Sequence, residues 1–473
     1  MAVYDEFESF ELTPADYSFP MFYTGCTISF RLSNPERGLI VLRDAIDRLV
    51  CYLPFLTGCV VPSTSKPGVM EVHFPAQGGA ISDIFIIQRL PHLRLPVQID
   101  SASRVNIETY DRNAALITAP MHIAASPTDH PVMRFQINLL ADGIILALFV
   151  NHMVIDGTGV GALLASLADC CNDAPCLSVS TECELTTREI LLAALERGRS
   201  PNFPGPAGAG PPILDTITQT GHEDVHDSSL LDYNFFIPAA KIKQLRGLIQ
   251  NIDPNFVSED DVLTAILWMR LGRLRYHQPP QRGPTVSACM LQRVVNVRHR
   301  LSPRVPSHYL GNCFIMVNQT MTTAELGHKT PSDSQHSEET FARQIAFVAR
   351  ALRDQLNNVD DRFVWSYLSQ FPTANSWSNT SVHEPDVAVT SIRRLSVYEK
   401  DFGPVLGKVV DFEMLPYMNP EGVCTIKPRR VDDDAWEVGV TLRREDMDRL
   451  RSDGMWRSLV SKESPLRVFE AVM

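Results

Sequence analysis

The feature that most constrains the fold is a pair of long apolar segments before mid-chain, "VMRFQINLLADGIILALFVNH" (132–152). Ala141-Asp142-Gly143 interrupts them, and an Asp-Gly pair between two apolar runs is a hairpin-turn signal. The segment therefore predicts two adjacent antiparallel strands. The residues that follow, "GTGVGALLASLADCC" (157–171), have the small and apolar composition of a helix packed tightly on a sheet. A strand–strand–helix unit of this kind predicts a mixed α/β fold.

The rest of the chain mixes helices and strands in the same way. "SEDDVLTAILWMRLGRLR" (258–275) predicts an amphipathic helix with Ser258 as its N-cap and acidic residues in its first turn. "EETFARQIAFVARALRDQLNNV" (338–359) predicts a second helix. The spacing of Leu39, Leu42, Ala45 and Leu49 predicts a third. Three segments are typical of strands, namely "VSACMLQRVVNVRHRL", "VCTIKPRR" and "WEVGVTL".

One compositional break divides the chain. The Pro and Gly content of "RGRSPNFPGPAGAGPP" (197–212) excludes a helix or a central strand there. We therefore predict an α/β (α+β) protein with an N-terminal domain over residues 1–200, a linker or crossover loop over 201–230 and a C-terminal domain over 231–473.

The balance of acidic and basic residues limits which kinds of binding partner the protein can have. Lys and Arg number 43 against 55 Asp and Glu, for a net charge of −12. This disfavours nucleic acid or an anionic membrane as the main partner but leaves room for a local basic pocket. No run reaches the ~18 apolar residues of a membrane span. The acidic start lacks a signal-peptide pattern, and the 10 cysteines include no C-x-x-C pair, so we expect a cytoplasmic protein with structural thiols.

The candidate for chemistry is "HMVIDG", with His152 at the end of the second apolar run and Asp156 in the turn before the helix. A strand end fixes an imidazole, and the glycines that follow leave backbone space for a ligand. A neutral imidazole there can take a proton from an alcohol or amine that attacks an acyl carbonyl. The His-x-x-x-Asp spacing also arises by chance in a chain with 13 histidines, so the residues alone leave a structural histidine open.

Three other patterns favour structural interpretations. "HEDVH" (222–226) formally matches a zinc-protease pattern, but its polar, glycine-led context favours a solvated loop. "GTGVGA" (157–162) lacks the spacing of a dinucleotide fingerprint, which favours close helix packing. Asp401, in "KDFGPVLGK", has no second acid at ligand spacing, so an ion pair with an arginine is favoured over a metal ligand or a base. We expect no metal site.

Together these segments resemble the BAHD acyltransferases, which use acyl-CoA in specialised metabolism. "HMVIDG" is similar to the family's H-x-x-x-D-G and "DFGPVLGK" to its D-F-G-x-G. "SEDDVLTAILW" is similar to S-x-x-D-x-L-x-A-x-x-W, and "VVNVRHRLSPRVPSHYLGNCF" to V-D-x-R-x-R-L-x-P-x-x-P-x-x-Y-x-G-N. Four motifs in this order span the chain. "YEKDFGPVLGK" and "LRREDMDRLRSD" look most like the fungal branch, which includes the trichothecene 3-O-acetyltransferases.

The resemblance implies two similar α/β domains, each like chloramphenicol acetyltransferase, with an active-site channel between them. Acyl-CoA, in the simplest case acetyl-CoA, and a small alcohol or amine would meet there without a metal, in a monomer. His152 would be the general base. Asp156 would point away from the substrate and hold its loop, with Gly157, through an arginine. Asp401 would also be structural, with Arg298 as its partner.

Two further roles follow from the resemblance. Thr390 matches a threonine that hydrogen-bonds the tetrahedral oxyanion, which agrees with the need for a donor where charge develops. An ordinary strand threonine remains the alternative. Ser258 falls in a region where members of the family contact coenzyme A, although an N-cap role alone would explain a serine at this position. The family usually has a tryptophan at the position of Ile392 and an aspartate at the position of Asn296. These two differences leave undecided which residues line the acceptor site and what surrounds Arg298.

Two alternatives remain at this point. Peptide-synthetase condensation domains carry H-H-x-x-x-D-G, whereas Asn151 precedes the histidine here and no carrier domain is recognised. A non-catalytic binder on the same scaffold is the other. The sequence does not decide the acceptor, the acyl length or O- against N-acylation. The fungal relatives suggest, by analogy, a hydroxylated terpenoid, polyketide or alkaloid.

Overall fold

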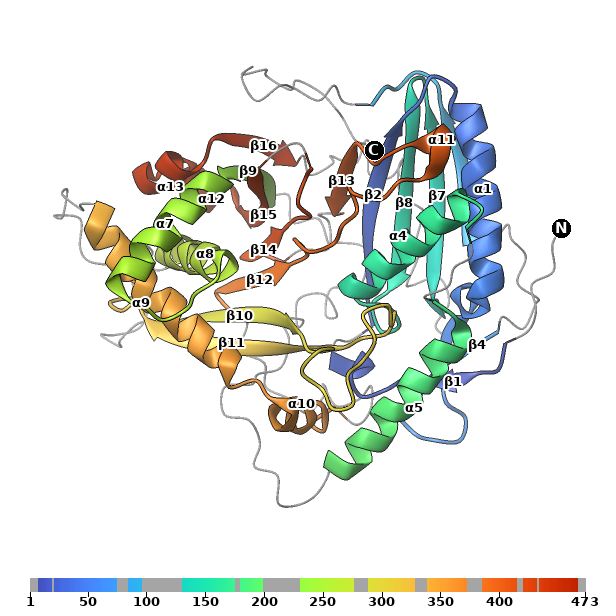
Figure 1. The fold of residues 1–473 in the computed structure, drawn as a ribbon, viewed down its shortest axis with the longest axis horizontal. Helices are drawn as coiled ribbons and strands as arrows, with labels where there is room; N and C mark the ends of the chain where they lie inside the picture. The colour runs from blue at the N-terminus through green and yellow to red at the C-terminus, as the bar shows by residue number, and fades with distance from the viewer. Residues whose placement is uncertain are drawn as a thin grey trace.

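A computed structural model of the chain describes the following residues: 7–18, 21–74, 84–95, 130–174, 179–198, 230–275, 288–327, 338–371, 385–414, 420–431 and 434–466. Within them two mixed α/β halves lie side by side (Figure 1). The predicted α/β class with two domains is confirmed. The linker predicted over 201–230 lies outside the described residues except for Leu230, where strand β9 begins.

The predicted hairpin forms the centre of the N-terminal sheet. β7 (Met133–Leu140) and β8 (Gly143–Asn151) pair antiparallel across a two-residue turn. The full sheet has the order β13-β2-β8-β7-β5, with β2 over Tyr23–Arg31 and β5 over Phe85–Leu90. Every residue of β8 is buried, because the strand lies at the middle of the sheet.

Helices α1 (Pro35–Tyr52) and α4 (Gly157–Cys171) pack against each other beside this sheet (Figure 1). α5 (Thr181–Gly198) follows α4 along the chain. A small second sheet in this half has the order β1-β4-β3-β6. Its strands are Phe10–Glu11, Met70–His73, Cys59–Pro62 and His130–Pro131.

The C-terminal sheet has seven strands in the order β11-β10-β12-β14-β15-β9-β16. In that order the strands span Phe314–Thr322, Ala288–Asn296, Val387–Ser391, Val423–Ile426, Ala435–Arg443, Leu230–Pro238 and Lys462–Leu466. The three strands expected from the sequence are β10, β14 and β15. The helices of this half are α7 (Ala239–Ile252), α8 (Glu259–Arg275), α9 (Glu338–Asn357), α10 (Asp361–Leu368), α12 (Arg444–Ser452) and α13 (Gly454–Leu459).

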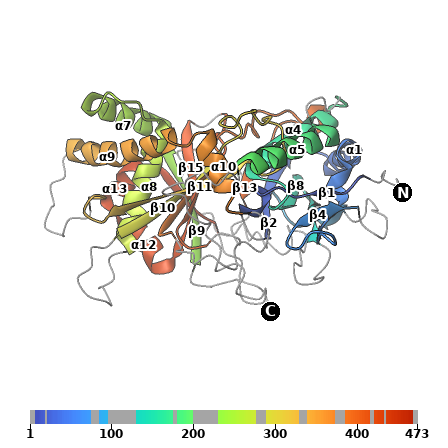
Figure 2. The same ribbon diagram turned by 90° about the horizontal axis from the view of Figure 1, so that it is seen from below.

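Helix α8 is not amphipathic as predicted. Val262 to Met269 are all fully buried, because α7, α9 and α12 pack around the helix (Figure 2). Its N-terminus is as predicted. The Ser258 hydroxyl accepts from the Asp261 amide at 3.2 Å, and the Asp261 carboxylate accepts from the Ser258 amide at 2.8 Å. This reciprocal pair satisfies two of the amides that a helix start leaves open.

One strand departs from the predicted division into two sequential domains. β13 (Asp411–Met414), from the C-terminal part of the chain, pairs antiparallel with β2 and becomes the edge of the N-terminal sheet. Phe412 on this strand is 1% exposed and belongs to the N-terminal core. The two halves are therefore joined through a shared sheet as well as by the chain between them.

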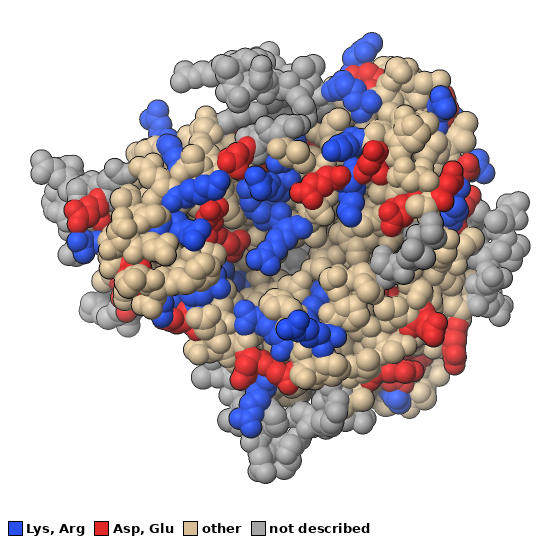
Figure 3. Space-filling model, in the orientation of Figure 1, with Lys and Arg blue, Asp and Glu red and all other residues tan. Residues whose placement is uncertain are grey.

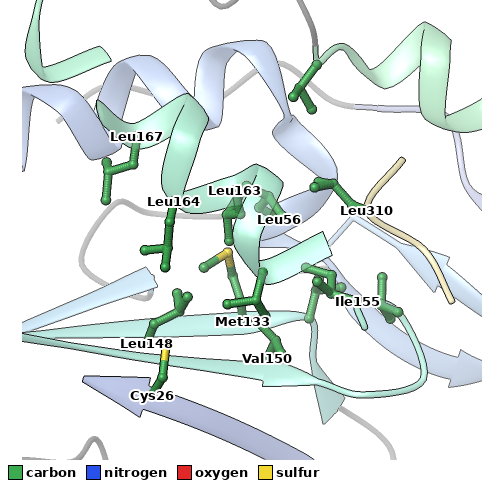
Figure 4. Packing of buried hydrophobic residues seen from close by; sticks show 14 of the residues in the cluster. Cys26, Leu56, Met133, Leu148, Val150, Ile155, Leu163, Leu164, Leu167 and Leu310 are labelled. Carbon is green, nitrogen blue, oxygen red and sulfur yellow. The ribbon is translucent and has the colours of Figure 1, made fainter. Parts of the chain in front are cut away.

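The core of the N-terminal half lies between α4 and the sheet. Figure 4 shows Leu163, Leu164 and Leu167 of α4 among the residues packed with Met133 and Leu148 of the sheet. Each buried aliphatic side chain of this kind contributes on the order of 1.5–3 kcal/mol relative to exposure. This packing fixes α4 and, with it, the turn that carries Asp156. No helix within the described ranges combines the length and apolarity needed to cross a membrane.

Candidate active site

A cavity of about 250 Å³ lies between the two halves. Strands β2, β8 and β13 of the N-terminal sheet contribute to its wall, and β10, β11, β12 and β14 of the C-terminal sheet contribute the rest. Its lining residues include Phe22, Leu148, Val150, His152, Asp156, Gly157, Thr158, Asn296, Phe314, Met316, Thr390, Ile392, Leu395, Phe412, Met414 and Thr425. His152 and Thr390, predicted from distant parts of the sequence, thus line one cavity.

His152 is fixed at the end of β8 by backbone and ring contacts. Its amide donates to the Phe22 carbonyl at 2.9 Å, and its carbonyl accepts from the Asn312 side-chain amide at 2.8 Å. The Phe22 ring stacks on the imidazole with centroids 4.8 Å apart, and the Phe314 ring meets it edge-on at 5.8 Å. The imidazole is therefore held between two aromatic rings, from the N-terminal and the C-terminal half.

The surroundings of His152 favour the neutral imidazole. Removal of the ring from bulk water lowers its pKa from the usual 6.5, and the nearby carboxylate of Asp156 opposes this shift without reversing it. Since a histidine acts as a base only when it is uncharged, the net direction keeps the ring competent at neutral pH.

The carboxylate of Asp156 is bound by an arginine. Both of its oxygens accept from Arg298, each at 2.9 Å, and both residues are 3% exposed. The same carboxylate accepts from the Gly159 amide at 2.8 Å as the N-cap of α4, and from the Cys313 amide at 3.1 Å. Asp156 therefore joins the helix start in one half to the Cys313 loop in the other.

The predicted pairing of Arg298 with Asp401 is wrong. Arg298 gives two donors to Asp156 and others to the carbonyls of Tyr309 and Gly311, so its guanidinium is engaged elsewhere. Asp401 is exposed, and its carboxylate accepts from the Gly403 amide at 2.9 Å. Among the described residues no lysine or arginine forms an ion pair with it. The contact that the structure shows for the Asp401 carboxylate is with a turn rather than with an arginine.

That turn requires glycine at two positions. Gly403 and Gly407 have φ of +88° and +67°, a region that side chains disfavour. The intervening residues form α11 (Gly403–Leu406), and the buried ring of Phe402 packs edge-on against Phe30 of β2 at 5.0 Å. The Asp-Phe-Gly segment thus anchors the chain just before β13 joins the N-terminal sheet.

The glycines after Asp156 serve close packing, as predicted, but their neighbours come from the other half. A Cβ on Gly159 would lie 2.0 Å from the Leu310 carbonyl oxygen, and one on Gly161 would lie 2.5 Å from Leu395. Gly157 differs, because a Cβ there would meet only Ile392, at an ordinary 3.6 Å. Gly157 lines the cavity and leaves it open.

Thr390 lies on β12 opposite Thr425 of β14, and both line the cavity. Ile392, where the family usually has tryptophan, borders the same space. Its smaller side chain leaves room that an indole would fill. The assignment of Thr390 to the oxyanion remains a prediction.

Asn296 and Ser258 both form hydrogen bonds with nearby residues. Asn296 accepts from the Arg298 amide at 3.0 Å and donates to the Thr158 hydroxyl at 2.9 Å, so it keeps a link to Arg298 without the aspartate of the family motif. Ser258 is bound to Asp261 at 2.7 Å and to Arg353 at 2.8 Å, and it is not among the cavity-lining residues. Its contact with coenzyme A stays a prediction.

No group of three or more His, Cys, Asp or Glu side chains in the described ranges is arranged to hold a metal. The "HEDVH" segment (222–226) lies outside those ranges.

Basic residues neighbour cavity-lining positions along the chain of this acidic protein. Arg393 and Arg394 stand between the lining residues Ile392 and Leu395, and the Arg393 guanidinium donates to the Ala435 carbonyl at 2.9 Å. Burial and the neighbouring Arg429 lower the pKa of Arg393. Burial together with Arg300, Arg394 and Arg304 lowers the pKa of His299. Figure 3 shows Lys and Arg gathered over the middle of this face, around a hollow between the halves.

Some positioning residues were missed by sequence reasoning. Phe22 carries no motif, and only the pairing of β2 with β8 brings it to His152. Asp16 lies near the N-terminus and accepts from Arg188 at 2.7 Å and from Asn312 at 2.9 Å, behind the histidine loop. Asn312 belongs to "YLGNCF" (309–314), and the resemblance of this segment to a family motif is the signal that could have identified it.

Comparison with known proteins identifies similar sequences over the whole chain. The family model described as "Transferase family" matches residues 105–455, and that of the "Trichothecene 3-O-acetyltransferase-like N-terminal domain" matches 22–171. The chain is 31% identical to the O-acetyltransferase cpsE of Aspergillus campestris, with full coverage of both chains. It is 28% identical to the communesin N16 acyltransferase cnsK of Penicillium expansum, with 98% of this chain and 99% of the relative covered.

Solved structures share the fold. The structure of F. sporotrichioides TRI101 complexed with coenzyme A and T-2 superposes with a TM-score of 0.70 at 20% identity, over 96% of this chain and 99% of that one. Vinorine synthase superposes with a TM-score of 0.64 at 15% identity, over 96% and 95% of the two chains.

Proposed function

Because the chain belongs to the Transferase family, the acyl-CoA-dependent BAHD acyltransferases, we propose that His152 is its general base in acyl transfer to a small metabolite. The acyl donor is acyl-CoA, in the simplest case acetyl-CoA. One observation carries the proposal. The imidazole lines the cavity between the halves, is held between Phe22 and Phe314, and has a pKa below its usual value.

The reaction is a direct transfer with both substrates bound. His152 takes the proton from an acceptor hydroxyl as the oxygen attacks the thioester carbonyl carbon. The carbonyl oxygen becomes negatively charged, and the Thr390 hydroxyl donates a hydrogen bond to it. The C–S bond then breaks, and the coenzyme A thiolate leaves with the proton that His152 held. Asp156 takes no proton in this sequence, since its carboxylate is committed to Arg298.

Two arginines adjacent in sequence to lining residues support an anionic donor. Arg393 and Arg394 stand between Ile392 and Leu395, and coenzyme A carries phosphate groups that guanidinium side chains recognise well. The placement also suits the overall charge, because a protein with a net charge of −12 would otherwise repel this substrate.

The acceptor proposed is a hydroxylated, largely apolar secondary metabolite. Side chains such as Leu148, Val150, Met316, Phe412 and Met414 make much of the cavity wall apolar. Most of the similar relatives are named O-acetyltransferases, whereas the Penicillium expansum relative is named for N16. We therefore propose O-acylation, with a nitrogen acceptor as the alternative. A cytoplasmic monomer remains part of the proposal, and the free thiols of the nine described cysteines are compatible with it.

The function is tested by incubating purified protein with a series of acyl-CoAs and a fungal metabolite extract. We expect enzyme-dependent release of free coenzyme A together with a metabolite that has gained one acyl group, detected by mass spectrometry. Thermal stabilisation by acetyl-CoA without any acylated product across a broad acceptor panel would instead identify a non-catalytic binder. No stabilisation and no product with any acyl-CoA would refute the proposal.

The pH dependence of the reaction follows from the lowered pKa of His152. The neutral base is present above its pKa and is lost as the pH falls through it. We therefore expect kcat/KM to be level near neutral pH and to decline in acid with a midpoint below 6.5, the ordinary histidine value. Steady-state rates with circular dichroism at each pH separate titration from unfolding. A midpoint above 6.5 would contradict the assigned environment.

A further inference from the structure

The side-chain amide of Asn296 has only one possible orientation. The backbone amide of Arg298 points at it from 3.0 Å and needs an oxygen to accept its hydrogen. The Asn296 oxygen must therefore face Arg298, and its NH₂ group faces the Thr158 hydroxyl, 2.9 Å away. The usual ambiguity between amide oxygen and nitrogen is removed by this neighbour.

The orientation of Asn296 determines what Thr158 can do. Since the Thr158 oxygen accepts from Asn296, the hydroxyl hydrogen is not used in that bond. An aspartate at position 296 would act in the opposite way, because a carboxylate can only accept and would take the hydroxyl hydrogen for itself. The asparagine that replaces the usual family residue therefore leaves Thr158 able to donate.

Thr158 is placed where a donor is useful. It lies in the first turn of α4, two residues after Asp156, and lines the same cavity as His152 and Thr390. A Cβ placed on the preceding Gly157 would lie 3.6 Å from Ile392, two residues after Thr390. The two threonines thus line one cavity from different halves of the molecule, Thr158 from α4 and Thr390 from β12.

We propose that Thr158 is a second hydrogen-bond donor to the acyl carbonyl oxygen, acting with Thr390, and that Asn296 sets the direction of its hydroxyl. The inference rests on the proposed acyl transfer. No bond of Thr158 is made or broken. Its hydroxyl donates to the thioester oxygen, and the hydrogen bond strengthens as that oxygen gains charge in the tetrahedral intermediate.

Binding of two donor analogues tests the proposal directly. Acetyl-CoA and S-ethyl coenzyme A differ at the acyl carbonyl, which is a methylene group in the latter. Calorimetry should show that the wild type binds acetyl-CoA more tightly, by about threefold to tenfold for each net hydrogen bond to the acyl oxygen. Thr158→Val should lose one such factor and keep the part due to Thr390, because valine keeps the shape of threonine without its hydroxyl. Thr158→Ser should retain it.

The turnover number, kcat, tests the contact between the Thr158 hydroxyl and the acyl oxygen independently of binding. Thr158→Val should lower kcat roughly 10²-fold, as for loss of one oxyanion donor, with a smaller change in KM for acetyl-CoA. Asn296→Asp should also lower kcat, but add little in the Thr158→Val background, since both changes remove one donor. Thr181→Val, on α5 where the hydroxyl contacts the Tyr52 carbonyl, is the matched control and should leave both measurements unchanged.

Two results would overturn the inference. Full retention of the acetyl-CoA preference and of kcat in Thr158→Val would show that its hydroxyl does not contact the acyl oxygen, while the proposed function stands. Failure of the wild type to bind either analogue would overturn the proposed function and this inference with it.

Discussion

Replacement of His152 by alanine is expected to lower kcat/KM for acyl transfer about 10²–10⁴-fold, the usual contribution of a general base. The acceptor hydroxyl would then lose its proton only to water. The fold should survive, because the hydrogen bonds that hold this position, to Phe22 and Asn312, use the backbone of residue 152. Rates of free-thiol release from acetyl-CoA measure the loss, once an acceptor has been identified.

The matched control is His92→Ala, which removes an exposed imidazole outside the cavity lining. It should turn over at the wild-type rate. The His152→Ala protein should still bind acetyl-CoA and keep its circular dichroism spectrum, so that lost activity reports lost chemistry. A folded His152→Ala enzyme that acylates as fast as the control would remove His152 from the mechanism.

Most of the secondary structure could be predicted from local sequence patterns. The Asp-Gly turn between two apolar runs predicted β7 and β8, and the capping pair at Ser258 and Asp261 predicted the start of α8. In both cases the signal lies within a few residues of the element it determines. The burial of α8 on all sides was not predictable in this way, because it depends on three other helices packing around it.

Long-range pairings were harder to predict. The strand β13 crosses from the C-terminal part of the chain to the edge of the N-terminal sheet, and nothing in "DFEM" indicates which sheet it joins. Arg298 was assigned to Asp401, although the carboxylate that binds it is Asp156. The resemblance identified Asp156, Asp401 and Arg298 as candidates but gave no distances between them. Only the fold determines which of the two carboxylates lies beside the guanidinium.

The candidate site was recognisable because its base lies at a strand end followed by glycines. That pattern identified His152 and Asp156 before any contact was known. The aromatic rings that hold the imidazole were not recognisable, since Phe22 and Phe314 are 130 and 162 residues away along the chain (152 − 22 and 314 − 152). Motifs thus identified the candidate base, and the tertiary structure supplied its environment.

The Asp156–Arg298 pair is expected to dominate the stability of this site. Both side chains are buried, and the carboxylate accepts four hydrogen bonds, two from Arg298 and one each from the amides of Gly159 and Cys313. Burial alone lowers the pKa of Arg298, but Asp156 outweighs it and the net direction is upward. Each charge is therefore stable in this interior position only while the other is present.

Arg298→Ala should lower the free energy of unfolding by about 3–5 kcal/mol, because it leaves the Asp156 carboxylate buried without its counter-charge. Arg31→Ala is the matched control, since Arg31 and Asp142 have the same 2.9 Å separation but side chains that are 43% and 22% exposed. Removal of such an exposed pair should cost about 0–1 kcal/mol. Midpoints of urea denaturation, followed by tryptophan fluorescence, measure both.

A second change separates the unpaired charge from the lost packing. Asp156→Asn in the Arg298→Ala background removes the isolated carboxylate, so the double variant should unfold at a higher urea concentration than Arg298→Ala alone. If the double variant were the less stable of the two, the cost of Arg298→Ala would come from the hydrogen bonds to Tyr309 and Gly311 that it also deletes. The ion pair would then not be what holds the histidine loop against the C-terminal half.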